Sequence, residues 1–371
     1  MKMVAILLAA VLVSGCLSGE TRQWGESEPE RPENSSDVSN VVEEVSQNAL
    51  EAPLVFTHEI FDPDFASHIT PLGELNGGYS EAQTIGGVMV NLKPEAYANN
   101  NEIEVRAPTD MILERYAYWS SGGEKGWVLH FRVSPDVVLK YDHITRASDG
   151  VMDATTRTPS SDSRDQFLTK PLAVKAGEVV AYTSGTSLAH NWNIYLTDAT
   201  QENNFANRER LTKDEAGRRL LTARCPFDFY PEDLKREYMD LMGYSRAGQS
   251  QTCGTASRDV SGTLSGMWHF SPDAETGLRE ELDGIYASPL SVFRNSAGET
   301  VVHQVDNRRL DIQADEPTNK DPAKITSEHC YRTDGGYAFF KVVSATEMKF
   351  AYSDSGSCPS ALPASSKTYY R

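Results

Sequence analysis

The chain lacks an apolar run long enough to cross a bilayer, and it is short of basic residues. Residues 3–13 are uncharged and apolar, but a membrane-spanning helix needs about 20 such residues. Lys and Arg number 35 against 53 Asp and Glu, so the formal net charge is −18. A surface this acidic repels phosphate groups and argues against nucleic acid or anionic lipid as a partner. The length of 371 residues leaves room for two domains of ordinary size.

Several signatures of catalysis are absent as well. The sequence contains no Gly-x-Ser-x-Gly motif, and no glycine-rich phosphate-binding loop precedes a helix. Carboxylates are plentiful, but their positions give no reason to pair two of them as a glycosidase couple. The sequence therefore gives no support for a serine nucleophile, for nucleotide binding or for glycoside cleavage.

Cysteine is scarce, with 5 residues in the chain, and none lies in a Cys-x-x-Cys pair, which argues against a four-thiolate zinc site. Four of them lie in the C-terminal part: Cys225, Cys253, Cys330 and Cys358. An even number in an exported chain indicates disulfides, with three connectivities open. We favour Cys225–Cys253 and Cys330–Cys358, because each pair encloses a compact local segment.

The fifth cysteine, Cys16, directly follows the apolar run and the small residues Ser14 and Gly15, and Lys2 precedes that run. This order is typical of a bacterial lipoprotein signal. We predict that residues 1–16 are the signal and lipidation site, and that lipidated Cys16 anchors the protein to a membrane. The protein would then be extracytoplasmic, either periplasmic or at the cell surface. The alternative is an ordinary secretory signal with a chance cysteine.

Residues 17–52 are predicted to form a disordered acidic tether. The stretch 26–36 is acidic, rich in Pro and Ser, and almost free of apolar side chains. Such a segment cannot bury enough surface to fold. Ordered structure is expected to begin near residue 53.

The remainder is predicted to be mainly β, as an antiparallel β-sandwich domain at 53–210 and a small disulfide-braced β-rich domain with a short helix at 211–371. Short apolar or alternating runs separated by turn residues indicate the strands. In the first domain the predicted strands are 104–107, 111–119, 127–133, 137–144, 178–183 and 192–196. In the second they are 290–294, 300–305, 337–343 and 347–352, the last two paired.

Other segments are predicted to be helix or loop. Residues 147–165 are rich in Ser, Thr and Asp and are predicted to be an exposed loop. Thr212 and Glu215 fit a capping box that opens a short helix. A second helix is predicted to begin at Pro231 and to end near Gly243.

Four motifs between Val105 and Asp198 resemble the lysostaphin-type (M23, LytM-like) zinc metallopeptidase domain. The run 105–110 resembles that family's Ala-Pro-x-Asp-Gly turn, 138–144 its Tyr-x-His strand, and 174–183 a further strand. Asn191 and Asn193 fall where the family has His-x-His. Residues 71–76 resemble the entry segment of lipoprotein-like relatives, and the cysteine-containing C-terminal part fits the same relatives.

The departures from this family concern the metal site. An active member holds zinc with a His, an Asp and the last His of His-x-His, and a catalytic zinc site keeps one position open. Here residues 77–87 contain neither His nor Asp, and neutral Asn191 and Asn193 are poor zinc ligands. His143 remains from the set, at a position where the family has a general acid or base. The resemblance therefore implies a degenerate domain with no catalytic residue, with His143 as a vestigial candidate, and with no metal or other cofactor.

Other histidines could in principle take over the lost ligand positions. His130 is predicted to lie on a neighbouring strand and His190 beside the altered motif, while a third group of His and acidic side chains lies at 58–68. We interpret His130 and His190 as ordinary polar residues of a sheet edge or loop. The group at 58–68 lacks the spacing of metal ligands and is interpreted as part of a solvated strand.

We therefore predict a non-catalytic, membrane-anchored lipoprotein. Its first domain would bind peptidoglycan or another wall polymer, a peptide or an envelope protein through the former cleft, lined by Tyr141, His143, Asn191 and Asn193. One alternative is a zinc metalloendopeptidase with non-standard ligands, tested by tight zinc retention that depends on His143 and His190. Another is a purely structural lipoprotein, which would bind neither wall material nor a partner protein.

Overall fold

The computed structural model describes residues 54–371, except 75–85, 122, 157, 162–163, 188, 214, 245–247, 250–251, 273–279, 283–284, 288–289, 297, 305–307 and 313–318. The predicted signal, Cys16 and the tether lie outside the described residues. Among the described residues, no helix is long and apolar enough to span a membrane. All pairings between the named strands are antiparallel, which confirms the predicted mainly β fold.

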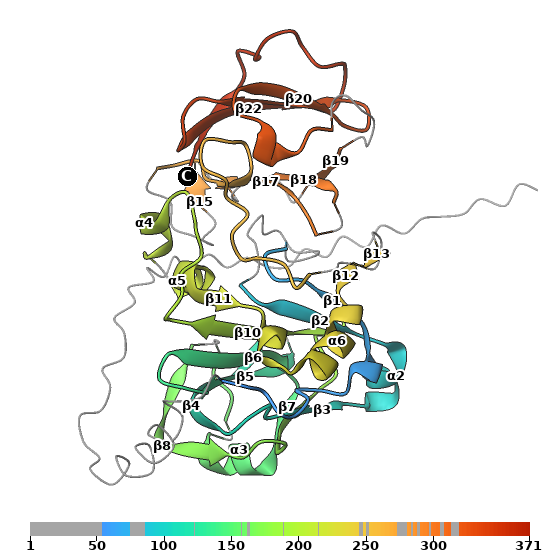
Figure 1. Ribbon diagram of the computed structural model, residues 1–371, viewed down its shortest axis with the longest axis vertical. Coiled ribbons are helices and arrows are strands. Elements are labelled where there is room, and N and C mark those ends of the chain that lie inside the picture. The colour runs from blue at the N-terminus through green and yellow to red at the C-terminus, as the bar shows by residue number, and fades with distance from the viewer. Residues whose placement is uncertain are drawn as a thin grey trace, which may run out of the picture. The chain divides into compact units, whose positions relative to one another are not determined.

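The largest sheet has eight strands, in the order β1-β2-β10-β6-β5-β4-β8 with β11 paired to β10 (Figure 1). Its strands are β1 (Ala66–Thr70), β2 (Val88–Leu92), β4 (Met111–Ser121), β5 (Glu124–Arg132), β6 (Val137–Ile144), β8 (Gln166–Val174), β10 (Asn191–Asp198) and β11 (Ala223–Arg224). A three-stranded sheet follows, made of β3 (Ile103–Arg106), β9 (Val179–Thr183) and β7 (Arg146–Ala147). One hydrophobic cluster takes in residues of both sheets, so they form a sandwich.

Short helices cover parts of this first core. They are η1 (Pro63–Phe65), α2 (Pro94–Tyr97), η2 (Ala98–Asn100), α3 (Asp149–Ala154), α4 (Arg208–Leu211), α5 (Glu215–Thr222), η3 (Pro226–Phe229) and α6 (Glu232–Asp240). The predicted helix from Pro231 is confirmed as α6. Its Tyr238 is fully buried in the first core and donates a hydrogen bond to the carbonyl oxygen of Phe61 (2.9 Å). The first core therefore includes residues on both sides of residue 210, where we placed the domain boundary.

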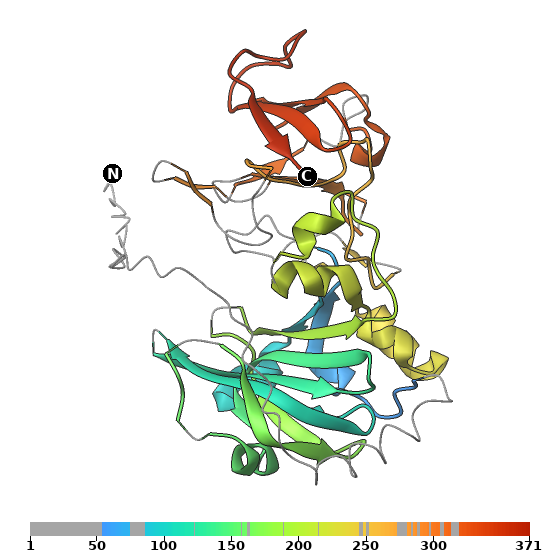
Figure 2. The same cartoon turned by 90° about the vertical axis from the view of Figure 1, so that its left-hand side faces the viewer.

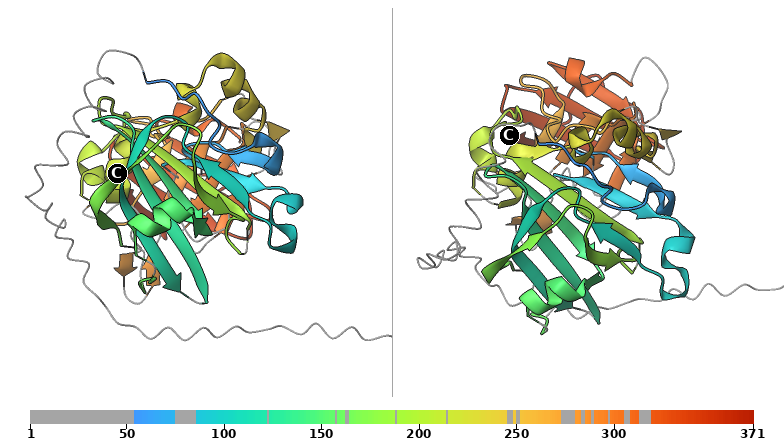
Figure 3. Two further views of the ribbon diagram at one scale, coloured as in Figure 1. Left: turned by 90° about the horizontal axis from the view of Figure 1, so that it is seen from below. Right: turned by 60° about the horizontal axis from the view of Figure 1, so that its bottom comes forward.

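Two local predictions were wrong. Residues 149–154 of the expected loop form α3, because Ser148 caps the helix N-terminus and Val151 is buried in the core. Figure 3 shows this helix against the strands of the first sandwich. Thr212 does not open a helix. It lies at the C-terminal cap of α4, where its Oγ1 donates to the carbonyl oxygen of Glu209 (2.7 Å), and α5 begins at Glu215.

The C-terminal part contains two four-stranded sheets (Figure 2). A second hydrophobic cluster takes in residues of both. One sheet consists of β14 (Gly266–Trp268), β17 (Leu290–Arg294), β18 (Thr300–Gln304) and β19 (Arg308–Asp311). The other consists of β20 (Glu328–Arg332), β21 (Tyr337–Val342), β22 (Glu347–Ser353) and β23 (Lys367–Tyr370), and the predicted pairing of β21 with β22 is confirmed. The remaining elements are β12 (Gly243–Tyr244), β13 (Gly248–Gln249), β15 (Glu280–Leu282), β16 (Ile285–Ala287) and η4 (Pro322–Lys324).

Both predicted disulfides are confirmed. Cys225–Cys253 and Cys330–Cys358 each close a separation of 28 residues. Disulfides of this kind form in oxidising compartments, which indicates an extracytoplasmic protein.

Next to the first disulfide, Gly254 occupies a position that only glycine fits. Its φ is +85°, and a Cβ atom there would lie 2.1 Å from the carbonyl oxygen of Leu72. We expect Gly254→Ala to lower the free energy of unfolding by about 2 kcal/mol, because backbone strain and a steric overlap add. Gly262→Ala is the control, since Gly262 has φ +73° but open space around it. In urea unfolding, Gly262→Ala should lose only about 1 kcal/mol of unfolding free energy. If the two variants lose the same amount, the steric argument is contradicted.

Candidate functional site

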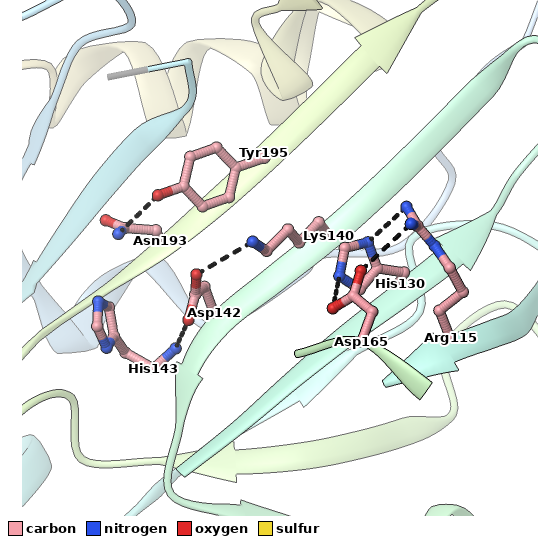
Figure 4. Close-up of polar contacts among 8 residues, drawn as sticks. All are labelled: Arg115, His130, Lys140, Asp142, His143, Asp165, Asn193 and Tyr195. Carbon is pink, nitrogen blue, oxygen red and sulfur yellow. Dashed lines mark hydrogen bonds and ion pairs between the residues drawn. The ribbon is translucent and has the colours of Figure 1, made fainter. Parts of the chain in front are cut away.

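The outer face of the large sheet carries a polar patch where β6 pairs with β10. In this register Asn193 lies opposite Asp142 and Tyr195 opposite Lys140. Successive residues of a strand point to opposite faces, so Trp192 and Ile194 enter the core while their neighbours face outward. Figure 4 shows the outward side chains together on this face.

Asp142 is the charged centre of this patch. Its Oδ1 accepts a hydrogen bond from the backbone N–H of His143 (2.8 Å), and its Oδ2 lies 3.3 Å from Nζ of Lys140. Burial by itself would raise the pKa of Asp142, but the charges of Lys140 and His143 and these hydrogen bonds outweigh it and lower the pKa to about 2. Asp142 is therefore a carboxylate at neutral pH, already paired with a lysine.

His143 adopts a left-handed backbone conformation, with φ +61°. At this point Asp142 and His143 together oppose the single residue Val128, because the register between β5 and β6 shifts between Trp127 and Leu129. This is a β-bulge, and bulges re-aim side chains. In Figure 4 the ring of His143 lies beside Asp142 and Asn193. A non-glycine residue held at positive φ costs free energy, and such strain is concentrated at functional sites.

This strain gives a direct prediction about stability. His143→Gly should be about 1 kcal/mol more stable than His143→Ala, because glycine adopts positive φ without the Cβ clash that alanine suffers. Urea unfolding of the two variants measures the difference, and both lack the imidazole, so its contacts cancel. A more stable alanine variant would show that residue 143 is not strained.

Asn191 and Asn193 are both largely buried, with 7% and 5% of their surface exposed. Thr186 Oγ1 donates to Oδ1 of Asn191 (3.3 Å), and Nδ2 of Asn193 donates to the hydroxyl of Tyr195 (3.1 Å). Within the described part of the chain, Oδ1 of Asn193 is buried without a hydrogen-bond partner. A buried acceptor without a partner is costly, and an enclosed water molecule is the usual way to satisfy such an atom.

Tyr141, which we predicted to line the cleft, belongs to the core instead. Its side chain is fully buried, and its ring lies 5.9 Å from that of Trp192. Its hydroxyl donates to the carbonyl oxygen of Arg106 on β3 (3.0 Å), so Tyr141 joins the two sheets. Of the predicted cleft residues, His143, Asn191 and Asn193 come together on the outer face and Tyr141 points away from them.

His130, on the same face, is held by hydrogen bonds to Arg115 and Asp165 that the sequence did not reveal. Nε2 of His130 lies 3.1 Å from Asp165, and Arg115 donates to Nδ1 (3.2 Å) while also pairing with Asp165. Burial lowers the pKa of His130 and outweighs the effect of Asp165. The register of β5 with β6 places His130 opposite Lys140, so this cluster borders the polar patch.

Three other histidines lie around the first core. His190 has φ +49°, and its ring stacks on Tyr97 at a centroid distance of 3.6 Å. His58 is exposed and contacts Thr57, and His68, whose pKa is lowered by burial, contacts Ser67. The cluster at 58–68 is thus divided between two surface segments.

The donor set does not fit the zinc site of the family. Among the described residues, no three His, Cys, Asp or Glu side chains are grouped as metal ligands. Asn191 and Asn193 on β10 carry amides in place of imidazoles. One atom of each amide is already used in a hydrogen bond within the protein. Most of the segment 77–87, where the family supplies its first ligands, lies outside the described residues.

Comparison with solved structures gives three matches. The first is the catalytic domain of a mutant of the prophage-encoded M23 protein EnpA from Enterococcus faecalis, which is 18% identical. The match covers 38% of this chain and 87% of the EnpA chain, with a TM-score of 0.24. A solution structure of lysostaphin is 13% identical. This match covers 86% of this chain and 92% of the lysostaphin chain, with a TM-score of 0.27. A structure of the antimicrobial peptidase lysostaphin from Staphylococcus simulans is 16% identical. This match covers 76% of this chain and 80% of that lysostaphin chain, with a TM-score of 0.23.

No protein-family model matches the chain, and no curated protein matches it either. The printed names of the three structural neighbours are those of an M23 protein and of lysostaphin.

Proposed function

We propose that this protein is a lipid-anchored envelope protein whose M23-like domain binds a component of the cell envelope without cleaving it. The observation that carries the proposal is the composition of the polar patch. Amides replace ligand histidines on β10, yet the patch keeps a strained His143 and a buried acceptor without a partner on Asn193. Backbone strain and an unpaired acceptor both cost stability, so their presence together supports a binding role.

Binding to wall material tests the proposal. A soluble form of the mature chain, starting at residue 17 without the lipidated Cys16, is sedimented with purified peptidoglycan sacculi. We expect it to co-sediment, and we expect His143→Ala and Asn193→Ala to weaken this about tenfold, a loss of about 1.4 kcal/mol. His58→Ala is the matched control, because His58 is an exposed histidine outside the patch. Equal co-sedimentation of all four proteins would refute the patch as the binding surface.

Metal content distinguishes the proposal from a zinc endopeptidase with non-standard ligands. The mature chain is purified without chelator and its zinc content is measured before and after incubation with zinc. We expect no stoichiometric zinc, because amide oxygens and a single histidine bind it weakly. Near-stoichiometric zinc that is lost in both His143→Ala and His190→Ala would favour the peptidase.

The anchor is proposed on the sequence around Cys16 alone. Cells that express the full chain should incorporate labelled palmitate into it, and Cys16→Ser should release the protein from the membrane fraction. Membrane association of the serine variant would contradict lipidation at this residue.

A further inference from the structure

The two disulfides of the chain differ in their access to solvent. Cys225–Cys253 and Cys330–Cys358 each close a separation of 28 residues, so the chain-entropy model assigns them equal stabilisation. Cys225 and Cys253 are buried, with 4% and 6% of their surface exposed, whereas Cys330 and Cys358 are half-buried. A thiolate reduces a disulfide by direct attack on a sulfur atom, so it reaches the second bridge more easily.

The second bridge fastens a segment that has few other attachments. Residues 355–365 lie between β22 and β23 and form no helix or strand. Among the described residues, no hydrogen bond joins them to a part of the chain outside 353–366, and the N–H of Ser366 donates to the carbonyl oxygen of Pro363 within the segment (3.1 Å). They include no charged side chain that could form an ion pair. We call residues 355–365 the flap.

The strand order determines where the flap runs. Cys330 lies on β20, and the chain that follows Cys358 returns to β23, beyond β21 and β22. Three strand spacings separate β20 from β23, roughly 14 Å, a distance that residues 359–366 can span. Tyr331 enters the second core, so Cys330 points to the outer face of the sheet. The flap therefore crosses this outer face.

An apolar strip lies on the same outer face. Cys330 pairs with Phe339, and Phe339 pairs with Ala351, across β20, β21 and β22. Phe340 and Phe350 enter the second core, so their neighbours Phe339 and Ala351 point outward. Even so, Phe339 and Ala351 are only 4% and 5% exposed. An outward ring is shielded only if another part of the chain covers it, and the flap is tied to Cys330 beside this ring.

We propose that Cys330–Cys358 is a site of thiol–disulfide exchange, whose reduction releases the flap and uncovers Phe339 and Ala351. The reductant is a dithiol. Its first thiolate bonds to one sulfur of the bridge, the S–S bond breaks, and the other cysteine leaves as a thiolate that takes up a proton. The second thiol of the reductant then displaces the bound cysteine, which also takes up a proton, and the reductant leaves as a disulfide. This site is independent of the envelope-binding function.

Timed reduction of the soluble mature chain by dithiothreitol tests the proposal. Free thiols are alkylated with iodoacetamide at intervals, and peptide mass spectrometry follows each bridge separately. We expect Cys330–Cys358 to be reduced at least about tenfold faster than Cys225–Cys253. The buried bridge is a matched control within the same molecule, because it closes a loop of equal length. Equal rates, or faster reduction of the buried bridge, would overturn the proposal.

Release of the flap is measured on the protein in which only Cys330–Cys358 is reduced. We expect proteinase K to cut within 355–365 at least about tenfold faster than in the oxidised protein, because the flap loses its attachment. Anilinonaphthalene sulfonate fluorescence should also rise, and should rise less in reduced Phe339→Ser. Unchanged digestion would overturn the proposal. Loss of the native circular dichroism on reduction would do so too, because the bridge would then support the whole sheet.

A variant without the bridge separates release from any effect of the reductant. Cys330→Ser/Cys358→Ser should be cut in the flap as fast as the reduced wild type, with no dithiothreitol present. Resistance of this folded variant to cleavage would contradict the proposal. If the variant does not fold, the reduced wild type decides the question by its digestion and its circular dichroism.

Discussion

Arg258→Met is expected to lower the free energy of unfolding by about 3–5 kcal/mol, because it leaves a buried carboxylate without its partner. Glu74 has 1% of its side chain exposed and lies 2.6 Å from the guanidinium of Arg258, which is itself 13% exposed. Arg258 also donates to the carbonyl oxygen of Gly73 (3.1 Å), and the backbone N–H of Ser296 donates to the same Glu74 oxygen (2.9 Å). The pair thus joins three segments that are distant in sequence.

Urea unfolding of three variants measures this loss. Arg236→Met is the matched control, since Arg236 pairs with Asp233 at the surface and should contribute less than about 1 kcal/mol. The double variant Arg258→Met/Glu74→Leu should regain much of the stability, because no charge then stays buried. If Arg258→Met loses no more than the surface control, the pair is not a buried ion pair in solution.

Alternation of apolar and polar residues predicted the central strands well. The strand predicted at 137–144 matches β6, because its buried residues alternate with half-buried ones. The one at 290–294 matches β17, a short run in which four consecutive residues are buried. Edge strands were missed. β8 contains Pro171 and exposed polar residues, and it pairs with β4 on both sides of a register shift, so its sequence carries little β signal.

The error at Tyr141 has a local physical cause. Residues 141 and 143 are two apart, so a regular strand would place both on one face. The bulge at His143 breaks this rule and sets its ring beside Asp142, while Tyr141 stays in the core. A non-glycine bulge has no sequence signature as clear as a glycine turn. The disulfide pairs, by contrast, followed from loop length.

Long-range ionic contacts could not be predicted from sequence spacing. Glu74 and Arg258 are 184 residues apart, and His130 and Asp165 are 35 apart. Each of these side chains is of a type that usually lies at the surface, and only the fold brings it to its partner. For the same reason, the polar patch was predicted by family resemblance rather than by spacing alone.

Acidification from pH 7.5 to pH 5 is expected to remove about 2 kcal/mol of stability through His269 alone. His269 is 5% exposed, and burial, aided by the charge of Arg210, lowers its pKa from 6.5 to about 3. Asp259 and Arg371 line the same small cavity. The unfolded chain binds a proton below about pH 6.5 and the folded chain does not. Stability is therefore fully present above pH 6.5 and is lost as the pH falls toward 3.

The variant His269→Gln isolates this contribution. Its unfolding free energy, measured in urea at pH 7.5, 6 and 5, should fall less steeply than that of the wild type, by about 1.4 kcal/mol per pH unit below pH 6.5. The absolute stability of His269→Gln at pH 7.5 does not affect the test, because only the slopes of unfolding free energy against pH are compared. His58→Gln removes an exposed histidine and should keep the wild-type slope. His130 and His68, whose pKa values are also lowered by burial, add losses of the same sign in every variant. If His269→Gln and the wild type show parallel slopes, His269 is accessible to protons in the folded protein and its buried position is wrong.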